Sequence, residues 1–328
     1  MTLLYTSETF LDHDTGAHPE RPLRLQVVHQ HLADSGLAER CTPPEWSPAT
    51  KEQVCRLHAE DYFDLLQKYA AAGGGQIETD TVVSQRSFDV ALLAAGAACD
   101  AVARVCRTEF IPFAAREEQE RNEFRSTADT TALCLVRPPG HHALTKGPMG
   151  FCLFNNIAIA ANSALVEHGL DRVLIVDWDV HHGNGTQDMF WEDEQVGFFS
   201  IHRFPFYPGT GDADETGSGR GLGCTRNLPI AYGTPRDEYL SAFQSNLEDF
   251  AAQVRPQLIL ISAGFDAHRQ DPVGSLQLET EDFITLTRIV RGIAAAHCGG
   301  RIVSILEGGY HPQRLAESVA MHLEGLLS

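Results

Sequence analysis

The sequence feature that most constrains the fold is an apolar strand that ends in a group of polar residues. Residues 173–176 are apolar at every position, which is typical of a strand covered on both faces in a parallel sheet. Four titratable residues follow within six positions of its end: Asp177, Asp179, His181 and His182. Alternate residues of an extended chain point to one side, so Asp177, Asp179 and His181 share a side. A carboxylate and an imidazole two residues apart can bind a metal, although a strand end with solvated acids is the simpler interpretation.

Composition excludes several other classes of protein. The 328 residues are 43% hydrophobic, enough for one large α/β core, and the net charge of −19 argues against direct binding of nucleic acid. An acidic surface could steer cationic substrates or simply keep the protein soluble. The eight cysteines are scattered without a C-x-x-C, and neither a membrane span nor a signal peptide is recognisable, so we expect a cytoplasmic protein without membrane contact.

The second half of the chain repeats one pattern: a short apolar strand, a polar loop and an amphipathic helix. Strands are expected at 132–136, 173–176, 196–201, 258–261 and 302–306, and helices at 155–168, 237–254, 281–297 and 312–327. This alternation predicts an α/β fold, a single three-layer α/β/α domain over residues 1–328 with a mainly parallel sheet. In the first half we expect a strand at 3–5, helices at 24–38, 51–72 and 87–107, a polar loop from Asp80, and a surface insertion at 108–131.

In a parallel sheet, the residues that follow the strands gather along one edge, where ligands bind. Seven polar residues should meet there: His141, His142, Asp177, Asp179, His181, Asp266 and Tyr310. Asp179, His181 and Asp266 form a candidate metal triad, since three protein ligands with an open position are typical of catalytic zinc, and two carboxylates also admit Fe(II). A metal there would favour amide hydrolysis, because it acidifies water and polarises a carbonyl.

The adjacent His141 and His142 follow a rigid Pro-Pro-Gly turn and could supply a general base and acid. Each imidazole needs a partner on its far nitrogen, for which Asp177 and Asn184 are the candidates. Tyr310, after two glycines, could donate its hydroxyl to a developing oxyanion. Each feature alone is weak, but their joint position at separate strand ends is a strong indication of an active site.

At these residues the chain resembles the histone deacetylase family, the zinc-dependent lysine deacetylases and their bacterial amidohydrolase relatives. The matching stretches are 18–22, 137–143, 150–156, 177–187, 207–211, 262–268 and 306–310. Asn184 and the Gly-Phe-Cys-Leu-Phe-Asn-Asn run at 150–156 resemble the class II branch.

The resemblance implies an arginase-like α/β fold and hydrolysis of N-acetyl or other N-acyl amides on a long amine side chain. It implies that Asp179, His181 and Asp266 bind zinc. His142 would be the general base and acid, and Tyr310 would polarise the carbonyl. His141 would be an electrostatic companion paired with Asp177. It also implies structural potassium held by Asp177, Asp179, His181, Ser200 and Ile201, with a second ion near Phe190, Asp193 and Val196.

Substrate contacts follow from the same resemblance. Gly150 and Phe151 would line the acyl-lysine tunnel, whose facing wall is Tyr207 where the family usually has Phe. Asp80 would lie at the rim. Polyamine-selective relatives carry a Glu gatekeeper where this chain has Val273, which weakens a polyamine assignment.

We therefore expect a protein-lysine deacylase that acts on an acyl-lysine protein or peptide. The alternatives are an acetylpolyamine or other small-molecule amidohydrolase, whose substrate is a small acylated amine, and a non-catalytic acyl-lysine-binding protein. An oligomer is possible on this sequence.

Overall fold

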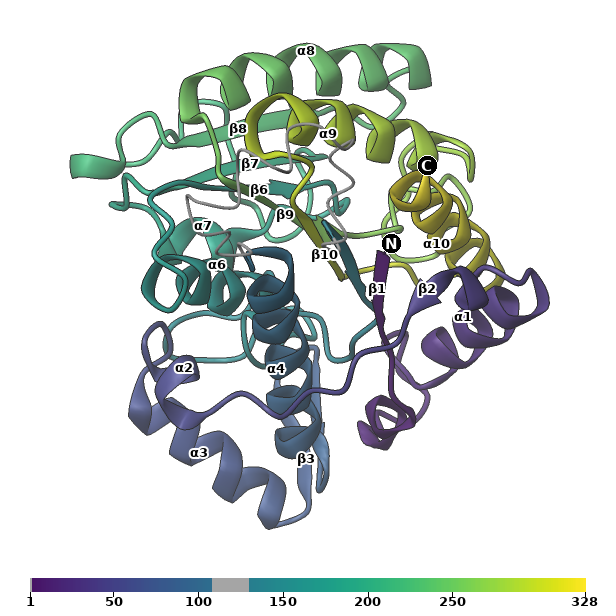
Figure 1. The fold of residues 1–328 in the computed structure, drawn as a ribbon. Coiled ribbons are helices and arrows are strands. Elements are labelled where there is room, and N and C mark those ends of the chain that lie inside the picture. Colours follow the sequence, from purple (N-terminus) through teal and green to yellow (C-terminus); the bar gives the residue numbers. More distant parts are fainter. Residues whose placement is uncertain (1, 108–129) are drawn as a thin grey trace, which may run out of the picture.

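The centre of the molecule is an eight-stranded sheet in which every pair of neighbours is parallel (Figure 1). The computed structural model describes residues 2–107 and 130–328. The strand order is β2-β1-β5-β10-β9-β6-β7-β8. The strands are β1 (Thr2–Tyr5), β2 (Cys41–Thr42), β5 (Thr131–Cys134), β6 (Val173–Asp177), β7 (Val196–Arg203), β8 (Thr225–Ile230), β9 (Leu258–Ala263) and β10 (Ile302–Leu306).

Helices cover both faces of this sheet. One layer contains α1 (Leu23–Asp34), α10 (Pro312–Leu327), α9 (Asp282–Cys298) and α8 (Arg236–Val254), which pack side by side in that order. The other contains α4 (Ser87–Val105), α6 (Asn156–Val166) and α7 (Asn184–Met189), with α2 (Lys51–Cys55) and α3 (Glu60–Ala71) packed against it. Short 3-10 helices lie at Glu8–Asp12, Ala38–Arg40 and Gly219–Gly221. The predicted three-layer α/β/α architecture with a parallel sheet is confirmed.

The central strands are buried along their whole length, as their uninterrupted apolar sequences predict. In register, Asp177 at the end of β6 lies between Ser200 of β7 and Ser262 of β9. Polar residues at these ends therefore face one another across neighbouring strands. Among the described residues, no helix is both long and apolar enough to cross a membrane.

Part of the first half was predicted wrongly. The expected helix at 51–72 is two helices, α2 and α3, with a break at 56–59. The break lets His58 turn inward, where its Nδ1 donates to the Leu144 carbonyl at 3.0 Å and its Nε2 accepts from the Asn155 amide at 2.9 Å. His58 is therefore a buried structural residue.

The expected polar loop after Asp80 is instead the second strand of a hairpin. β3 (Gly74–Glu78) and β4 (Thr81–Ser84) pair in antiparallel fashion outside the main sheet. The expected helix at 51–72 ends just before three glycines at 73–75, and these glycines also begin this hairpin. The predicted insertion at 108–131 was one residue too long at its end, because Thr131 is the first residue of β5. Residues 108–129 of this segment lie outside the described residues.

A buried ionic network anchors the loop that follows β5. The Glu20 carboxylate accepts from Arg137 Nη2 at 2.7 Å and pairs with Arg24 Nη1 at 3.3 Å. Burial alone would raise the pKa of Glu20, but the Arg137 guanidinium holds it well below its usual range. Since Arg137 directly precedes the Pro-Pro-Gly turn, this network fixes the start of the segment that carries His141 and His142.

We predict that Glu20→Ala lowers the free energy of unfolding by about 3–5 kcal/mol, because it leaves two buried guanidinium groups without their shared partner. Chemical denaturation would measure this change. Asp249→Ala is the matched control, since Asp249 is 74% exposed where it pairs with Arg226, and its removal should cost at most about 1 kcal/mol. Equal losses in the two variants would contradict the anchoring role.

Candidate active site

The structure brings all seven predicted polar residues to the carboxyl edge of the sheet. His141 and His142 follow β5, Asp179 and His181 follow Asp177 at the end of β6, and Asp266 and Tyr310 follow β9 and β10. The four strands lie side by side in the order β5-β10-β9-β6. Their loops therefore meet above the middle of the sheet, and all seven side chains are buried.

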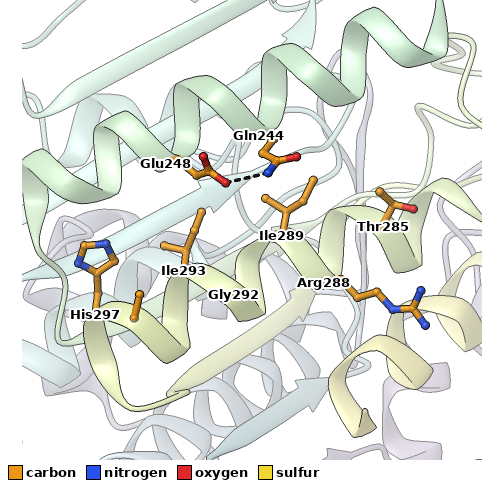
Figure 2. Close-up of a pocket in the computed structure, with 9 residues that line it drawn as sticks. Gln244, Glu248, Thr285, Arg288, Ile289, Gly292, Ile293 and His297 are labelled. Carbon is orange, nitrogen blue, oxygen red and sulfur yellow. Dashed lines mark hydrogen bonds between the residues drawn. The ribbon is translucent and has the colours of Figure 1, made fainter.

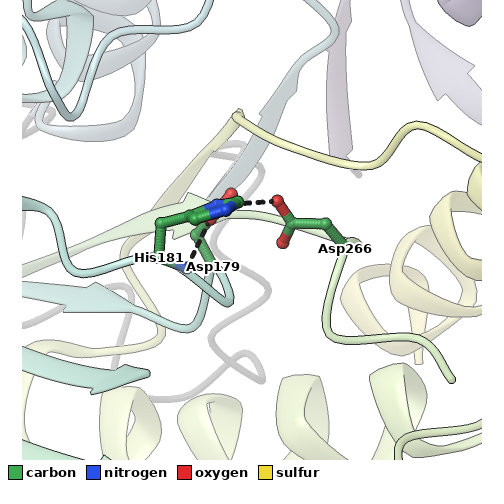
Figure 3. Close-up of side chains that lie close together, drawn as sticks. All are labelled: Asp179, His181 and Asp266. Carbon is green, nitrogen blue, oxygen red and sulfur yellow. Dashed lines mark hydrogen bonds and ion pairs between the residues drawn. The ribbon is translucent and has the colours of Figure 1, made fainter. Parts of the chain in front are cut away.

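Asp179, His181 and Asp266 form a compact group in which one ligand atom from each residue lies within 4.8 Å of the others (Figure 3). His181 Nδ1 is 3.0 Å from Asp179 Oδ1 and 3.2 Å from Asp266 Oδ2. Figure 3 shows the imidazole lying between the two carboxylates, which come from different loops.

The donor set of this group fits a divalent metal ion. Asp266 Oδ2 is buried and accepts no hydrogen bond from the described residues, although it lies near His181. Burial and the neighbouring Asp179 carboxylate raise the pKa of Asp266 to about 7. Two buried carboxylates and one imidazole, with an oxygen free of hydrogen bonds, match the ligand chemistry of a catalytic zinc or iron site.

Backbone amides hold the two carboxylates in place. Asp179 accepts from the His181 amide at 2.9 Å and the Gly308 amide at 2.8 Å, and Asp266 accepts from the Val180 amide at 2.9 Å. Glycine is required at position 308, because a Cβ there would lie 2.1 Å from Asp266 Oδ2 and 2.5 Å from Asp179 Oδ2. The glycine thus permits the loop after β10 to approach both carboxylates closely.

The two histidines beside this group have different partners and different charges. His141 Nδ1 donates to Asp177 Oδ2 at 3.0 Å, and His142 Nδ1 donates to Asn184 Oδ1 at 2.7 Å, as the sequence suggested. Burial opposes protonation of His141, but the Asp177 and Asp179 carboxylates raise its pKa to about 10. Burial and the neighbouring His141 hold the pKa of His142 well below its usual range. His142 is therefore neutral, and its Nε2 is available to accept a proton.

Glu307 is a residue of this site to which the sequence gave no role. Its fully buried carboxylate accepts from the Gly140 amide at 2.6 Å and from Ser262 Oγ at 3.2 Å, and so joins the loops after β5 and β10 to strand β9. Burial raises the pKa of Glu307 to about 7. Its position directly after a buried strand, like that of Asp177, was a signal that could have identified it.

Aromatic side chains surround the polar group. Tyr310 packs edge-to-face on Phe151 with ring centres 5.6 Å apart, and Tyr207 packs edge-to-face on His142 at 5.3 Å. Phe206, which the sequence analysis overlooked, stacks on His181 at 5.3 Å. Burial raises the pKa of Tyr310 well above its usual range, although Arg24 opposes the effect. The Tyr310 phenol is therefore protonated and can donate a hydrogen bond.

The other residues predicted to contact the substrate are Gly150, Asp80 and Val273. Gly150 adopts a φ of 56°, and a Cβ there would lie 2.4 Å from His142 Cδ2. The Phe151 amide donates to Thr81 Oγ1 at 3.1 Å, which links the wall residue to the hairpin that carries Asp80. The Val273 amide donates to Asp271 Oδ1 in the loop after β9.

Of the residues expected to bind potassium, Asp177, Ser200 and Ile201 lie on the adjacent strands β6 and β7, with Asp177 opposite Ser200. The two other members, Asp179 and His181, follow β6. Phe190, Asp193 and Val196, expected near a second ion, lie between the end of α7 and the start of β7.

A separate groove of about 550 Å³ lies between α8 and α9 (Figure 2). Gln244 and Glu248 face Ile289, Gly292 and Ile293 across it. It contains none of the predicted site residues, and its lining has one carboxylate, Glu248, and one imidazole, His297, in place of the clustered groups at the sheet edge.

Comparisons with known proteins agree with this geometry. A family model described as the histone deacetylase domain matches residues 18–326. The chain is 37% identical over 296 residues to a histone deacetylase-like amidohydrolase of Pseudomonas aeruginosa, covering 89% of this chain and 72% of that protein. It is 38% identical over 334 residues to the human polyamine deacetylase HDAC10, covering 98% of this chain but only 46% of that protein. The crystal structure of the HDA15 HD domain matches with a TM-score of 0.87 and 35% identity, over 99% of this chain and 88% of that one.

We predict that Gly308→Ala lowers the affinity for zinc about tenfold or more, because the added methyl group displaces Asp179 and Asp266. Competition with a chromogenic chelator would measure the affinity. Gly292→Ala in α9 is the control, since a Cβ there meets no atom within 4 Å. Unchanged affinity in Gly308→Ala would show that these carboxylates do not hold the ion.

Proposed function

The chain belongs to the histone deacetylase family of hydrolases, which act on amide bonds, and from this we propose that it is a zinc-dependent lysine deacylase. The observation that carries the proposal is the buried Asp179–His181–Asp266 group beside a neutral His142, whose ring centre lies 5.8 Å from that of His181. The reaction is hydrolysis of the N-acyl amide on a lysine side chain, which releases a carboxylate and the free amine.

Asp179, His181 and Asp266 would hold the metal, with zinc preferred by family and Fe(II) compatible with the two carboxylates. A metal bound there would lower the pKa of water and polarise the acyl carbonyl. A metal bound there would act as the electrophile, beside His142 as the base. Both would lie in a buried site that excludes most water, where electrostatic interactions are strong.

His142 accepts the proton of the attacking water at Nε2 and later delivers it to the leaving amine. Its hydrogen bond to Asn184 fixes the tautomer that leaves Nε2 free. His141, protonated and paired with Asp177, gives the dyad a fixed positive charge that stabilises the anionic transition state. The Tyr310 hydroxyl donates to the carbonyl oxygen as negative charge develops there.

Phe151 and Tyr207 suit an unbranched alkyl chain, because aromatic walls bury methylene groups and exclude water from the amide. Tyr207 is 38% exposed, so its wall continues to the surface near Asp80. We also assign the potassium ion to Asp177, Asp179, His181, Ser200 and Ile201, with a second near Phe190, Asp193 and Val196. This assignment rests on family resemblance.

The second candidate is an acetylpolyamine amidohydrolase. The human relative is named a polyamine deacetylase, and the net charge of −19 would attract polycations. Against it, Val273 offers no carboxylate for a second ammonium group. The lysine substrate is therefore our first choice.

We predict that the zinc-loaded protein hydrolyses acetyl-lysine or longer acyl-lysine peptides with a higher kcat/KM than acetylated polyamines. A matched panel of these substrates, with Fe(II) loading in parallel, would measure the preference. Asp179→Ala should abolish turnover of every substrate. A preference for polyamines would favour the second candidate. Peptide binding without turnover would contradict an enzymatic role and favour an acyl-lysine-binding protein.

We predict that Tyr310→Phe lowers kcat about 10²- to 10³-fold with little change in KM, because it removes one hydrogen bond that forms fully only in the transition state. The phenyl ring retains the packing on Phe151. Steady-state kinetics on the best substrate of the panel would test this. Tyr232→Phe removes the hydroxyl of a 62% exposed tyrosine and should leave kcat unchanged. A wild-type kcat in Tyr310→Phe would refute the assigned role.

A further inference from the structure

The Asp271 carboxylate joins two turns beside the site. Its Oδ1 accepts from the amides of Val273 at 2.9 Å and Gly274 at 3.0 Å. Its Oδ2 accepts from the amides of Tyr310 at 2.6 Å and His311 at 3.2 Å. The residue is buried, with 7% of its surface exposed. One side chain therefore binds four backbone amides from two loops that are distant in sequence.

The four hydrogen bonds that Asp271 accepts are stronger than the neutral hydrogen bonds of an ordinary turn. Hydrogen bonds from amides to an ionised carboxylate are about twice as strong as neutral ones. The Tyr310 and His311 amides lie between the end of β10 and the start of α10, outside the ladder of the sheet. Without Asp271, the buried Tyr310 amide and the half-buried His311 amide would lose their partner, and an unpaired donor is costly in a protein interior.

The other atoms of the same turn are also fixed. The Gly308 amide donates to Asp179 Oδ2 at 2.8 Å, and the Gly309 carbonyl accepts from Arg24 Nε at 2.6 Å. Gly309 adopts a φ of 120°, and a Cβ there would lie 2.8 Å from Leu315 Cδ1. Asp179 and Arg24 thus hold the turn before Tyr310, while Asp271 holds Tyr310 itself.

The second turn that Asp271 binds is held independently. The Gly274 carbonyl accepts from Arg203 Nη1 at 3.0 Å, and the Arg203 guanidinium lies 4.0 Å from the centre of the Phe206 ring. A Cβ at Gly274 would lie 2.6 Å from the Asp266 carbonyl oxygen, so this turn packs closely on the loop of a proposed metal ligand. Asp271 therefore attaches Tyr310 to a turn that cannot easily move.

We propose that Asp271 is the positioning residue for Tyr310: it holds the Tyr310 backbone at the distance from which the hydroxyl reaches the substrate carbonyl. The inference rests on the proposed deacylase function. Asp271 does not contact the substrate and acts only through the backbone. A misplacement of about 1 Å is enough to cost about 10²-fold in rate.

The test is a double-mutant cycle between Asp271→Asn and Tyr310→Phe. Asparagine keeps the size of the side chain, but it replaces one acceptor oxygen with an amide group that cannot accept from a backbone N–H. We expect Asp271→Asn to lower kcat about 10- to 100-fold in the wild-type background and less than about threefold in the Tyr310→Phe background. Equal losses in both backgrounds would overturn the inference, because the effect would not then pass through Tyr310.

Two controls separate positioning from general damage. Asp282→Asn alters another buried carboxylate, which accepts from the Glu279 amide and pairs with Arg236, and should leave kcat unchanged. Zinc content should stay at one ion per chain in Asp271→Asn. A loss of zinc that accounts for the loss of rate would overturn the inference. If Asp271→Asn does not fold, Asp271→Glu keeps both acceptors but displaces them, and the same cycle applies.

Amide hydrogen exchange provides a measurement that needs no substrate. In Asp271→Asn the Tyr310 and His311 amides should exchange at least tenfold faster, while the Gly308 amide should keep its protection. Unchanged exchange at Tyr310 would overturn the positioning role even if the enzyme is active. A wild-type protein that hydrolyses no acyl amide would refute the proposed function, whereas the exchange experiment would still decide whether Asp271 holds this turn.

Discussion

The rest of the structure depends on four carboxylates buried at one edge of the sheet: Asp177, Asp179, Asp266 and Glu307. All four are almost completely inaccessible to solvent. An unpaired ionised carboxylate is very costly in such a place, so each must gain hydrogen bonds, a cation or a proton. Amides and imidazoles satisfy most of the oxygens, but Asp266 Oδ2 accepts no hydrogen bond within the described part of the chain. A bound cation would complete the compensation, and it would also give the site its chemistry.

The need to compensate these buried carboxylates also explains the conformation of the loops. Amides from one loop donate to carboxylates from another: Gly308 to Asp179, Gly140 to Glu307, and Tyr310 to Asp271. Each of these bonds joins loops that follow different strands, so the position of a reacting group depends on more than one loop. Gly308 is needed because any side chain there would collide with the carboxylates that the amide stabilises. The same hydrogen bonds therefore stabilise the buried charges and hold the active-site residues in position.

The sequence predicted the parallel sheet and the gathered polar residues because both follow from local patterns. The strand at 173–176 is apolar throughout, and the alternation from Asp177 to His181 predicts three side chains on one side, although the extended strand ends at Asp177. The β3–β4 hairpin was missed because its glycines resemble a helix stop, and α2 and α3 were merged because the inward turn of His58 depends on partners at Leu144 and Asn155. The contributions of Phe206 and Asp271 depend on contacts between distant segments, which no local pattern reveals.

The most direct test of this account is anomalous diffraction at the zinc edge from crystals grown with one equivalent of zinc. We expect one strong peak within bonding distance of Asp179, His181 and Asp266, at about 2.0–2.2 Å from each ligand atom. We also expect the peak to disappear in Asp179→Ala crystals. A peak at another site, or an active protein whose crystals show no metal at this edge of the sheet, would contradict the claim that a cation compensates the buried carboxylates.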